Sequence, residues 1–393
     1  MSKIDPKLYV DREQTLVKHV VLESYLEKLV YKVGRRGGTL NYIDGFAGPW
    51  QSKGQALQDT SPHIAARVLR SVREKLIQDG CPALDVRTLF IESDEERSRL
   101  LRDSFVCTEV PQVTVLCGAF EDHIEEAVAF SKAGQRPFHF SFIDPCGWTG
   151  LGLKAITPLL RAARGEVLVN FMTNQINRFI EDDQPKIAGQ FEDLYGDPTF
   201  RKSLIALTGL DRQDRMVDEY CARVRQAGGF AHVVSSIVLN PHDNRVHFHL
   251  VYGTRHDEGL RTFRDIERSA LGLQSKLRTA LQHEERKRNE PGQGFLFAQP
   301  QELLAIPHVE TLHERYLTRA RRRLIELLVA RDANRFDDLA VASMQYQTVS
   351  EKDTRDILMS MGKQIAIEGL EGKQRTPQWN KSHVVRTISK DLR

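Results

Sequence analysis

Five short apolar runs alternate with amphipathic helical segments through the first 171 residues, and this alternation constrains the fold more than any other feature of the chain. The runs are rich in β-branched and aromatic residues, and the links between them and the helices are short. Strands and helices in this order form a parallel sheet with helices on both faces. The predicted strands are 39–44, 86–91, 113–116, 138–143 and 166–171, and the predicted helices are 16–33, 62–77, 95–102, 121–133 and 153–163.

Two further strands, predicted at 230–238 and 246–251, differ from the first five because no helix separates them. Only a turn sequence, Pro241-His242-Asp243-Asn244, lies near the middle of this segment. Strands joined by so short a turn pair antiparallel. We therefore predict a Rossmann-like α/β fold in which a parallel sheet is closed by an antiparallel hairpin.

The chain has 393 residues, which leaves room for a second unit beside this core. The composition changes at a charged stretch that ends in Pro291-Gly292-Gln293-Gly294. We place the α/β domain at 1–274, a linker at 275–301 and a second domain at 302–393.

The second domain has the pattern of a winged helix. Helices are predicted at 311–328 and 336–344, and a third begins at Ser350. The Ser350 hydroxyl can cap this helix, and Asp353, three residues later, can complete a capping box. A basic hairpin at 373–388 ends the chain. Three helices followed by a two-stranded wing predict a winged-helix domain.

The composition excludes several classes of protein. Lys and Arg number 56 against 53 Asp and Glu, and the net charge of +3 is too small for a globally basic nucleic-acid-binding protein. No apolar run is long enough for a membrane span, and the N-terminus lacks the core of a signal peptide. The five cysteines lie far apart without a C-x-x-C pair, so we expect neither disulfides nor a metal site. We expect a soluble cytoplasmic protein.

Ligands of open parallel sheets bind beyond the carboxyl ends of the strands, and the first strand ends in a turn of small residues. The turn reads Asp44-Gly45-Phe46-Ala47-Gly48-Pro49-Trp50. Because Gly45, Ala47 and Gly48 are small, the backbone can approach a ligand closely and its amides can face it. A tight turn without a ligand explains the glycines about equally well.

The next two strands also end in candidate residues. Glu92 follows the second strand and could accept hydrogen bonds from ribose hydroxyls, although a solvated glutamate is the alternative. Gly118, Ala119 and Phe120 follow the third strand. Ala119 or Phe120 could pack near an adenine ring, and an ordinary turn before a helix explains them nearly as well.

The end of the fourth strand has the most residues that could take part in a reaction. Its sequence is Asp144-Pro145-Cys146-Gly147-Trp148. Pro145 fixes the backbone, and the Asp144 carboxylate can accept a hydrogen bond from a nucleophile or a substrate amine. Trp148 offers a face on which a planar or cationic group can stack. The alternative is a proline turn followed by a tryptophan packed in the core. Asp144, Pro145 and Trp148 are the candidate catalytic residues.

This succession of acids, small-residue turn, Asp-Pro pair and final hairpin resembles the class I S-adenosylmethionine-dependent methyltransferases. More closely, the chain resembles the three-Cys-motif partner (TcmP) family, from about Lys18 to the C-terminus. The resemblance implies a methyltransferase-like core with a C-terminal winged helix, S-adenosylmethionine as cofactor, and a partner protein with a cysteine cluster, of the radical iron–sulfur type. Its motifs are Tyr42-Ile43-Asp44-Gly45-Phe46-Ala47-Gly48-Pro49, Ser61-Pro62, Phe142-Ile143-Asp144-Pro145-x-Gly147 and His249-Leu250-Val251-Tyr252-Gly253-Thr254-Arg255-His256.

The resemblance also implies roles for individual residues. Asp44 to Pro49 would contact the methionine part of the cofactor, Glu92 its ribose, and Asp144 would face the transferable methyl. Trp50 departs from the family pattern, because many methyltransferases have a third glycine there, and an inward Trp50 would narrow the pocket. Cys146 and Gly147 depart from the Asp/Asn-Pro-Pro-aromatic signature of amino-methylating nucleic-acid enzymes, which weakens a direct claim of base methylation.

Three other features could be functional, but each also has a structural or surface explanation. His247 and His249 share one face of a strand, but no further ligand lies at metal spacing, and packed or solvent-facing histidines are commoner. Arg178 could bind a substrate carboxylate or phosphate, although a surface arginine is the default. Cys146 has no base nearby in the sequence that would make it a nucleophile.

Two functions follow from the sequence. The first is a methyltransferase that acts with a partner enzyme, and the second is a non-catalytic or nucleic-acid-binding interaction protein that retains the fold. The basic wing could bind phosphates. The helix that begins at Ser350 fits a DNA groove poorly, because Glu351, Asp353 and Asp356 make it acidic. This slightly favours a protein partner.

Overall fold

The computed structural model describes residues 4–48, 52, 57–106, 112–145, 147–182, 184–289, 307–368 and 379–388. The chain forms two compact units, Met1–His256 and Asp257–Arg393. Helix α10 (Asp257–Asn289) runs through the boundary predicted at 274, so the start of the predicted linker is helical. The rest of that linker lies outside the described residues.

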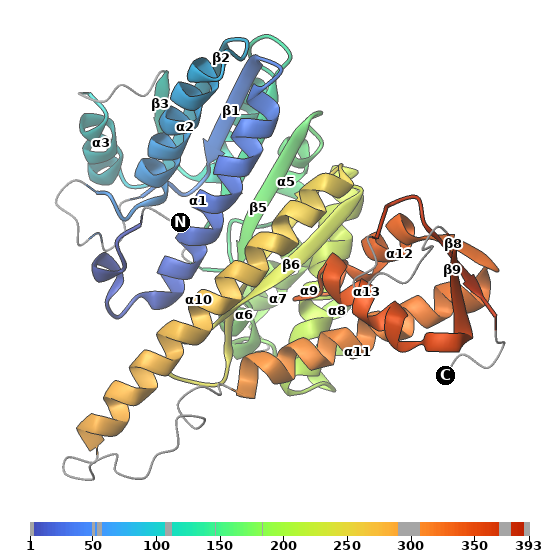
Figure 1. The fold of residues 1–393 in the computed structure, drawn as a ribbon. Helices are drawn as coiled ribbons and strands as arrows, with labels where there is room; N and C mark the ends of the chain where they lie inside the picture. Colours follow the sequence, from blue (N-terminus) through green and yellow to red (C-terminus); the bar gives the residue numbers. More distant parts are fainter. Residues whose placement is uncertain are drawn as a thin grey trace. The chain divides into compact units, whose positions relative to one another are not determined.

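The first unit is built on a seven-stranded sheet within the described residues, in the order β3-β2-β1-β4-β5-β7-β6 (Figure 1). Neighbours among β1 to β5 pair parallel, and β7 pairs antiparallel with both β5 and β6. The predicted parallel sheet closed by an antiparallel hairpin is therefore confirmed. The strands are β1 (Gly38–Asp44), β2 (Leu84–Glu92), β3 (Val113–Cys117), β4 (Phe138–Ile143), β5 (Gly165–Phe171), β6 (His232–Leu239) and β7 (Val246–Thr254).

Helices follow the strands as the sequence predicts, with two differences. The helix predicted at 121–133 is divided into the 3-10 turn η2 (Phe120–His123) and α4 (Ile124–Ser131). Four helices between β5 and β6 were not among the predicted segments. The helices of this unit are α1 (Glu13–Gly34), α2 (Ser61–Gln78), α3 (Glu95–Ser104), α4, α5 (Leu153–Leu160), α6 (Thr173–Arg178), α7 (Pro185–Tyr195), α8 (Phe200–Ile205) and α9 (Gly209–Gly228), after the 3-10 turn η1 (Pro6–Tyr9).

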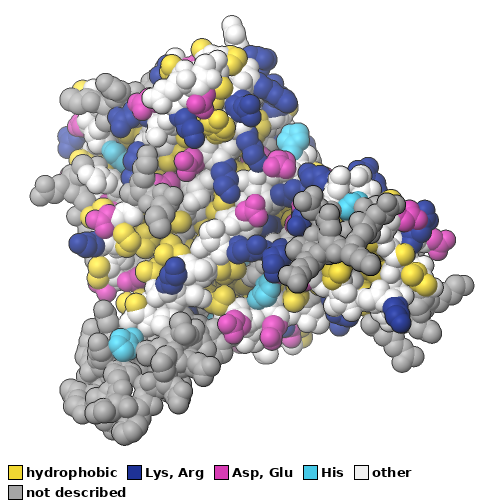
Figure 2. All heavy atoms as spheres, viewed as in Figure 1, with side chains coloured by type: hydrophobic (Ala, Val, Ile, Leu, Met, Phe, Trp, Pro, Cys, Tyr) yellow, Lys and Arg dark blue, Asp and Glu magenta, His cyan; other side chains and the backbone are white. Residues whose placement is uncertain are grey.

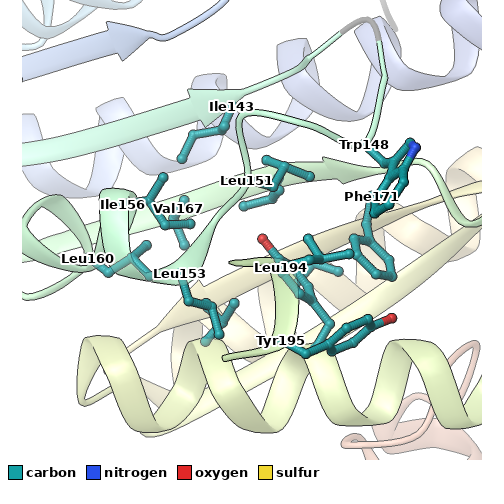
Figure 3. Packing of buried hydrophobic residues seen from close by; sticks show 14 of the residues in the cluster. Ile143, Trp148, Leu151, Leu153, Ile156, Leu160, Val167, Phe171, Leu194 and Tyr195 are labelled. Carbon is teal, nitrogen blue, oxygen red and sulfur yellow. The ribbon is translucent and has the colours of Figure 1, made fainter. Parts of the chain in front are cut away.

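Both faces of the sheet are buried, which is why the strands read as nearly continuous apolar runs. On one face, Tyr25 of α1 stacks on Phe140 with ring centroids 5.6 Å apart, and Phe140 stacks on Tyr42 at 6.2 Å. On the other face, Ile143 and Val167 belong to a cluster that includes side chains of α5 and α7 (Figure 3). The site described below lies at the carboxyl edge between these layers.

The second unit contains the predicted helices and a small sheet. The capping box of Ser350 and Asp353 at the start of α13 is confirmed. The sheet has the antiparallel order β8-β10-β9 within the described residues, and β8 was not predicted. Residues 369–378 and 389–393 of the predicted wing lie outside the described residues. Besides α10, the elements are α11 (Pro307–Ala330), β8 (Ala333–Arg335), α12 (Phe336–Ser343), α13 (Glu351–Ser360), the 3-10 turn η3 (Gly362–Gln364), β9 (Ile365–Glu368) and β10 (Val384–Thr387).

The acids of α13 are paired within this unit. Glu351 accepts hydrogen bonds from Arg261 and Arg355. Asp356 pairs with Lys352 at 2.9 Å, and Asp353 closes the capping box. The negative charge that the sequence assigns to this helix is therefore largely balanced by neighbouring cations.

Candidate functional site

A cavity of about 410 Å³ lies at the carboxyl ends of β1, β2, β3 and β4. This volume is in the range of small-molecule sites, and the position is where open parallel sheets bind ligands. All four strand ends that the sequence singles out therefore border one cavity. Its lining residues are Gly45, Phe46, Ile91, Glu92, Ser93, Gly118, Ala119, Phe120, Glu121, Pro145, Gly147, Thr149 and Gly150.

The turn after β1 is pinned to the neighbouring strands by its backbone. The Gly45 amide donates to the Phe142 carbonyl at 3.0 Å, and the Ala47 amide donates to the Ile91 carbonyl at 2.9 Å. A Cβ atom at Gly45 would lie 2.9 Å from the Phe120 ring, closer than such contacts allow. Glycine is therefore required here, because it lets Phe120 form part of the cavity wall.

Asp44 lies behind this turn and is fully buried rather than part of the cavity wall. Its carboxylate accepts a hydrogen bond from the Ser61 hydroxyl at 2.7 Å and from the Phe46 amide at 3.1 Å. Burial raises the pKa of Asp44 to about 7, although these two donors oppose the rise. Asp44 thus shapes the turn and carries a carboxyl group that titrates near neutral pH.

Glu92 lies at the end of β2 and lines the cavity while remaining only 3% exposed. Its Oε1 atom accepts a hydrogen bond from the Asp94 amide at 2.8 Å, which fixes the carboxylate. The Glu92 carbonyl also accepts from the Gly118 amide at 3.0 Å, so the ends of β2 and β3 are held together. Gly118 has φ +148°, a conformation that favours glycine.

Asp144 follows β4 and lies beside the cavity, next to the lining residue Pro145. Its two oxygens are held separately, because Lys18 of α1 forms an ion pair with Oδ2 and Asn170 of β5 donates to Oδ1 at 2.6 Å. The Lys18 ammonium also lies 5.8 Å from the centre of the Phe248 ring. The Asp144 side chain is 14% exposed, so a small ligand group could still reach it.

Lys18 and Asn170 were not predicted as site residues. A signal for Lys18 is present in the sequence, because it stands at helical spacing with Leu22, Tyr25 and Leu29, all of which are buried. A lysine in an apolar stripe requires a partner. The identity of that partner depends on tertiary packing.

Trp148 lies in the hydrophobic core. It is 6% exposed and lies near Phe171 in the cluster drawn in Figure 3. Its ring packs against Phe191 and Phe179 with centroids 4.9 Å and 6.1 Å apart. This position agrees with the alternative interpretation, a tryptophan packed in the core. Trp148 also lines a second cavity, of about 570 Å³, whose wall shares Thr149 and Gly150 with the first cavity. A role in stacking a substrate therefore stays a prediction.

None of the remaining predicted site residues that the structure describes lines the cavity. Arg178 is exposed at the end of α6 and does not line the cavity. Ala47 and Gly48 are buried in the turn, also away from the cavity wall. Pro49, Trp50 and Cys146 lie outside the described residues. Thr149 and Gly150, which were not predicted, also line the cavity.

The histidines of β7 are placed as packed residues. His249 is buried, its Nδ1 atom lies 3.1 Å from the Thr173 hydroxyl, and burial lowers its pKa to about 3. No group of three or more His, Cys, Asp or Glu side chains that could hold a metal occurs in the described part of the chain. Within the same residues, no helix is both long and apolar enough to cross a membrane. Cationic and anionic side chains are interspersed on the face drawn in Figure 2.

Comparisons of this chain with known proteins give matches among solved structures alone. No family model matches it, and none of the curated proteins matches it. Among solved structures, protein LPL1258 from Legionella pneumophila str. Philadelphia 1, of the family model DUF519, is 12% identical over 60% of this chain and 84% of its own, with a TM-score of 0.36. The plantazolicin methyltransferase BpumL in complex with SAH is 11% identical over 63% of this chain and 88% of its own, with a TM-score of 0.27. The mycolic acid cyclopropane synthase CmaA1, complexed with SAH and CTAB, is 12% identical over 66% and 73%, with a TM-score of 0.23. Likenesses at such scores carry no argument about this chain.

Proposed function

We propose that the chain is an S-adenosylmethionine-dependent methyltransferase of the TcmP type, acting with a partner protein that carries a cysteine cluster. One observation carries the proposal: a cavity at the carboxyl ends of β1 to β4 is lined by Gly45, Glu92 and Gly118. A close-approaching backbone and an acid one strand further on suit a nucleoside cofactor at this edge of a sheet. The strand order with an antiparallel β7 agrees with the class I methyltransferase resemblance.

The residues around the cavity fit this cofactor. The Glu92 carboxylate is fixed at the wall and can accept hydrogen bonds from two ribose hydroxyls. Ala119 and Phe120 supply apolar surface for an adenine ring. The close approach of Gly45 to Phe120 leaves room for a ligand only because Gly45 has no side chain.

The bound cofactor would supply an electrophilic methyl group on a sulfonium. The chain's own residues then have to align a nucleophile and exclude water. Asp144 can accept a hydrogen bond from the N–H or O–H of that nucleophile and take its proton. Lys18 and Asn170 would keep the carboxylate in one orientation for this task.

Calorimetric titration of the full chain with S-adenosylmethionine and with S-adenosylhomocysteine (SAH) tests the cofactor site. We expect binding to the unmodified protein and a loss of about tenfold to a hundredfold in the Glu92→Gln variant, because a charged hydrogen-bond acceptor is removed. Glu96→Gln is the matched control, since Glu96 is exposed on α3. Failure of the unmodified protein to bind either ligand would refute the proposal.

The alternative function is an interaction protein that retains the fold. Asp144→Ala separates the two, because an enzyme variant should lose turnover but keep its cofactor, whereas an adaptor should keep its partner unchanged. The partner and the winged-helix assignment of the second unit are parts of the proposal. Pairing of Glu351 with Arg261 and Arg355 removes one objection to nucleic acid as a ligand of that unit. A salt-sensitive nucleic-acid interaction would favour the alternative.

A further inference from the structure

Three charged side chains lie together behind the cavity wall: Asp44 on β1, Asp144 after β4 and Lys18 on α1. Lys18 forms the ion pair with Asp144, and their side chains are 11% and 14% exposed. Asp44 is fully buried, and both Asp144 and Lys18 act electrostatically on its pKa, Asp144 raising it and Lys18 lowering it. Lys18 is thus ion-paired with Asp144 and acts on Asp44 through its field, in a poorly hydrated place where charges interact more strongly than in water.

The cluster is one residue away from the cavity on two strands. Gly45 and Pro145, which directly follow the two acids in the sequence, both line the cavity. The two acids therefore stand next to residues of the cavity wall, and a charge in this part of the cavity interacts with them. With both acids ionised, the cluster carries one net negative charge.

We propose that Lys18 is a built-in counter-ion of the two acids and determines how strongly the site prefers a cationic ligand to a neutral one of the same shape. This inference rests on the proposed function, because the ligand pair in question is S-adenosylmethionine and SAH. The first carries a sulfonium, and the second carries an uncharged thioether. Their amino-acid and nucleoside parts are the same, so the ratio of the two dissociation constants isolates the effect of the sulfonium charge.

Replacement of Lys18 by methionine removes the ammonium and keeps most of the apolar stem. Asp144 is then a carboxylate without its counter-ion, and attraction for the sulfonium increases. We expect calorimetry on the full-length Lys18→Met variant to show a preference for S-adenosylmethionine over SAH about fivefold to tenfold larger than in the unmodified protein. Asp144→Asn makes the opposite change and should lower the preference by a similar factor.

Two control variants separate charge from structure. Lys18→Arg keeps the charge and should keep the preference of the unmodified protein. Lys28→Met changes an exposed lysine on the same helix and should leave both affinities unchanged. Circular dichroism verifies that each variant is folded, and if Lys18→Met does not fold, Asp144→Asn alone decides the question.

The outcomes distinguish the inference from the proposed function. If the unmodified protein binds neither ligand, the proposed function fails and the inference fails with it. If the unmodified protein binds both, but Lys18→Met or Asp144→Asn changes both affinities by the same factor, only the inference is overturned. In that case Lys18 would hold the fold or contact a part that the two ligands share.

Discussion

The Lys18 ammonium pairs with the Asp144 carboxylate across 126 positions of the sequence, from the first long helix to the end of the fourth strand. Asn170 holds the other carboxylate oxygen from β5. Three elements thus determine the orientation of one candidate catalytic side chain. This arrangement explains why the buried face of α1 contains a lysine at a position where its neighbours in the stripe are apolar.

Gly45→Ala should weaken cofactor binding while the protein stays folded. The added Cβ would lie 2.9 Å from the Phe120 ring, so Phe120 must move into the space that the ligand needs. We expect calorimetry to show a loss of at least about tenfold in affinity for SAH. Gly189→Ala is the matched control, since nothing lies within 4 Å of its added Cβ. Unchanged SAH affinity in Gly45→Ala would contradict the position of the ligand.

The sheet and most of its helices are predictable because the central strands are buried on both faces and the strands are bounded by turn residues. Glu92 and Gly45 are predictable site residues for a related reason, because the carboxyl ends of parallel strands meet at one edge. Asp44 follows the same rule, but the structure places it behind the turn rather than in the cavity wall. Local sequence does not report which side of a turn a side chain takes.

Other features depend on contacts that the sequence does not display. Strand β8 has three residues and exists because Asn334 and its neighbours pair with β10, about fifty residues further on. Helix α10 crosses the predicted boundary. The sequence predicts the boundary there because the surface of the helix is charged, as in a linker, although Arg264 and Glu267 within it are buried. Trp148 follows a proline turn, and the sequence does not show that its ring packs against Phe191 and also borders a cavity.

Asp44 should make stability depend on pH near neutrality. Its pKa is raised from 3.8 to about 7 by burial, so its contribution to stability is fully present below about pH 3.8 and is lost as the pH rises through about 7. Relative to Asp44→Asn, the unmodified protein should therefore lose stability as the pH rises from about 4, and the loss should end between about pH 7 and pH 8. Urea unfolding at several pH values measures this difference.

Asp94→Asn provides the control for that pH series. Asp94 is a helix-capping residue whose pKa is lowered, chiefly by the hydrogen bond from the Arg97 amide, so it stays ionised throughout the range from about pH 6 to pH 8. The stability difference between this variant and the unmodified protein should stay constant with pH. A constant difference for Asp44→Asn as well would show that Asp44 is ionised throughout the range.

Trp148→Ala should destabilise the first unit by about 3–5 kcal/mol, because it leaves a large cavity beside Phe191 and Phe179. Trp148→Phe keeps an aromatic ring in the same place and should cost clearly less. Urea unfolding of both variants tests this expectation. If Trp148→Ala unfolded at the same urea concentration as the unmodified protein, its side chain would have to be free for a ligand instead.

The second unit should depend on a buried ion pair within it. Arg264 Nη1 lies 2.6 Å from Glu267 Oε2, both side chains are 1% exposed, and Arg264 Nε also donates to the Met344 carbonyl at 2.8 Å. Arg264→Met leaves the Glu267 carboxylate buried without its cation, a loss of about 3–5 kcal/mol. Hydrogen exchange should accelerate in α12 and α13. Arg268→Met is the control, because Arg268 is half exposed and its ion pair with Asp353 contributes about 1 kcal/mol or less. Equal exchange rates in the two variants would mean that the buried Arg264 side chain, which pairs with Glu267 on α10 and donates to the Met344 carbonyl, does not stabilise α12 and α13.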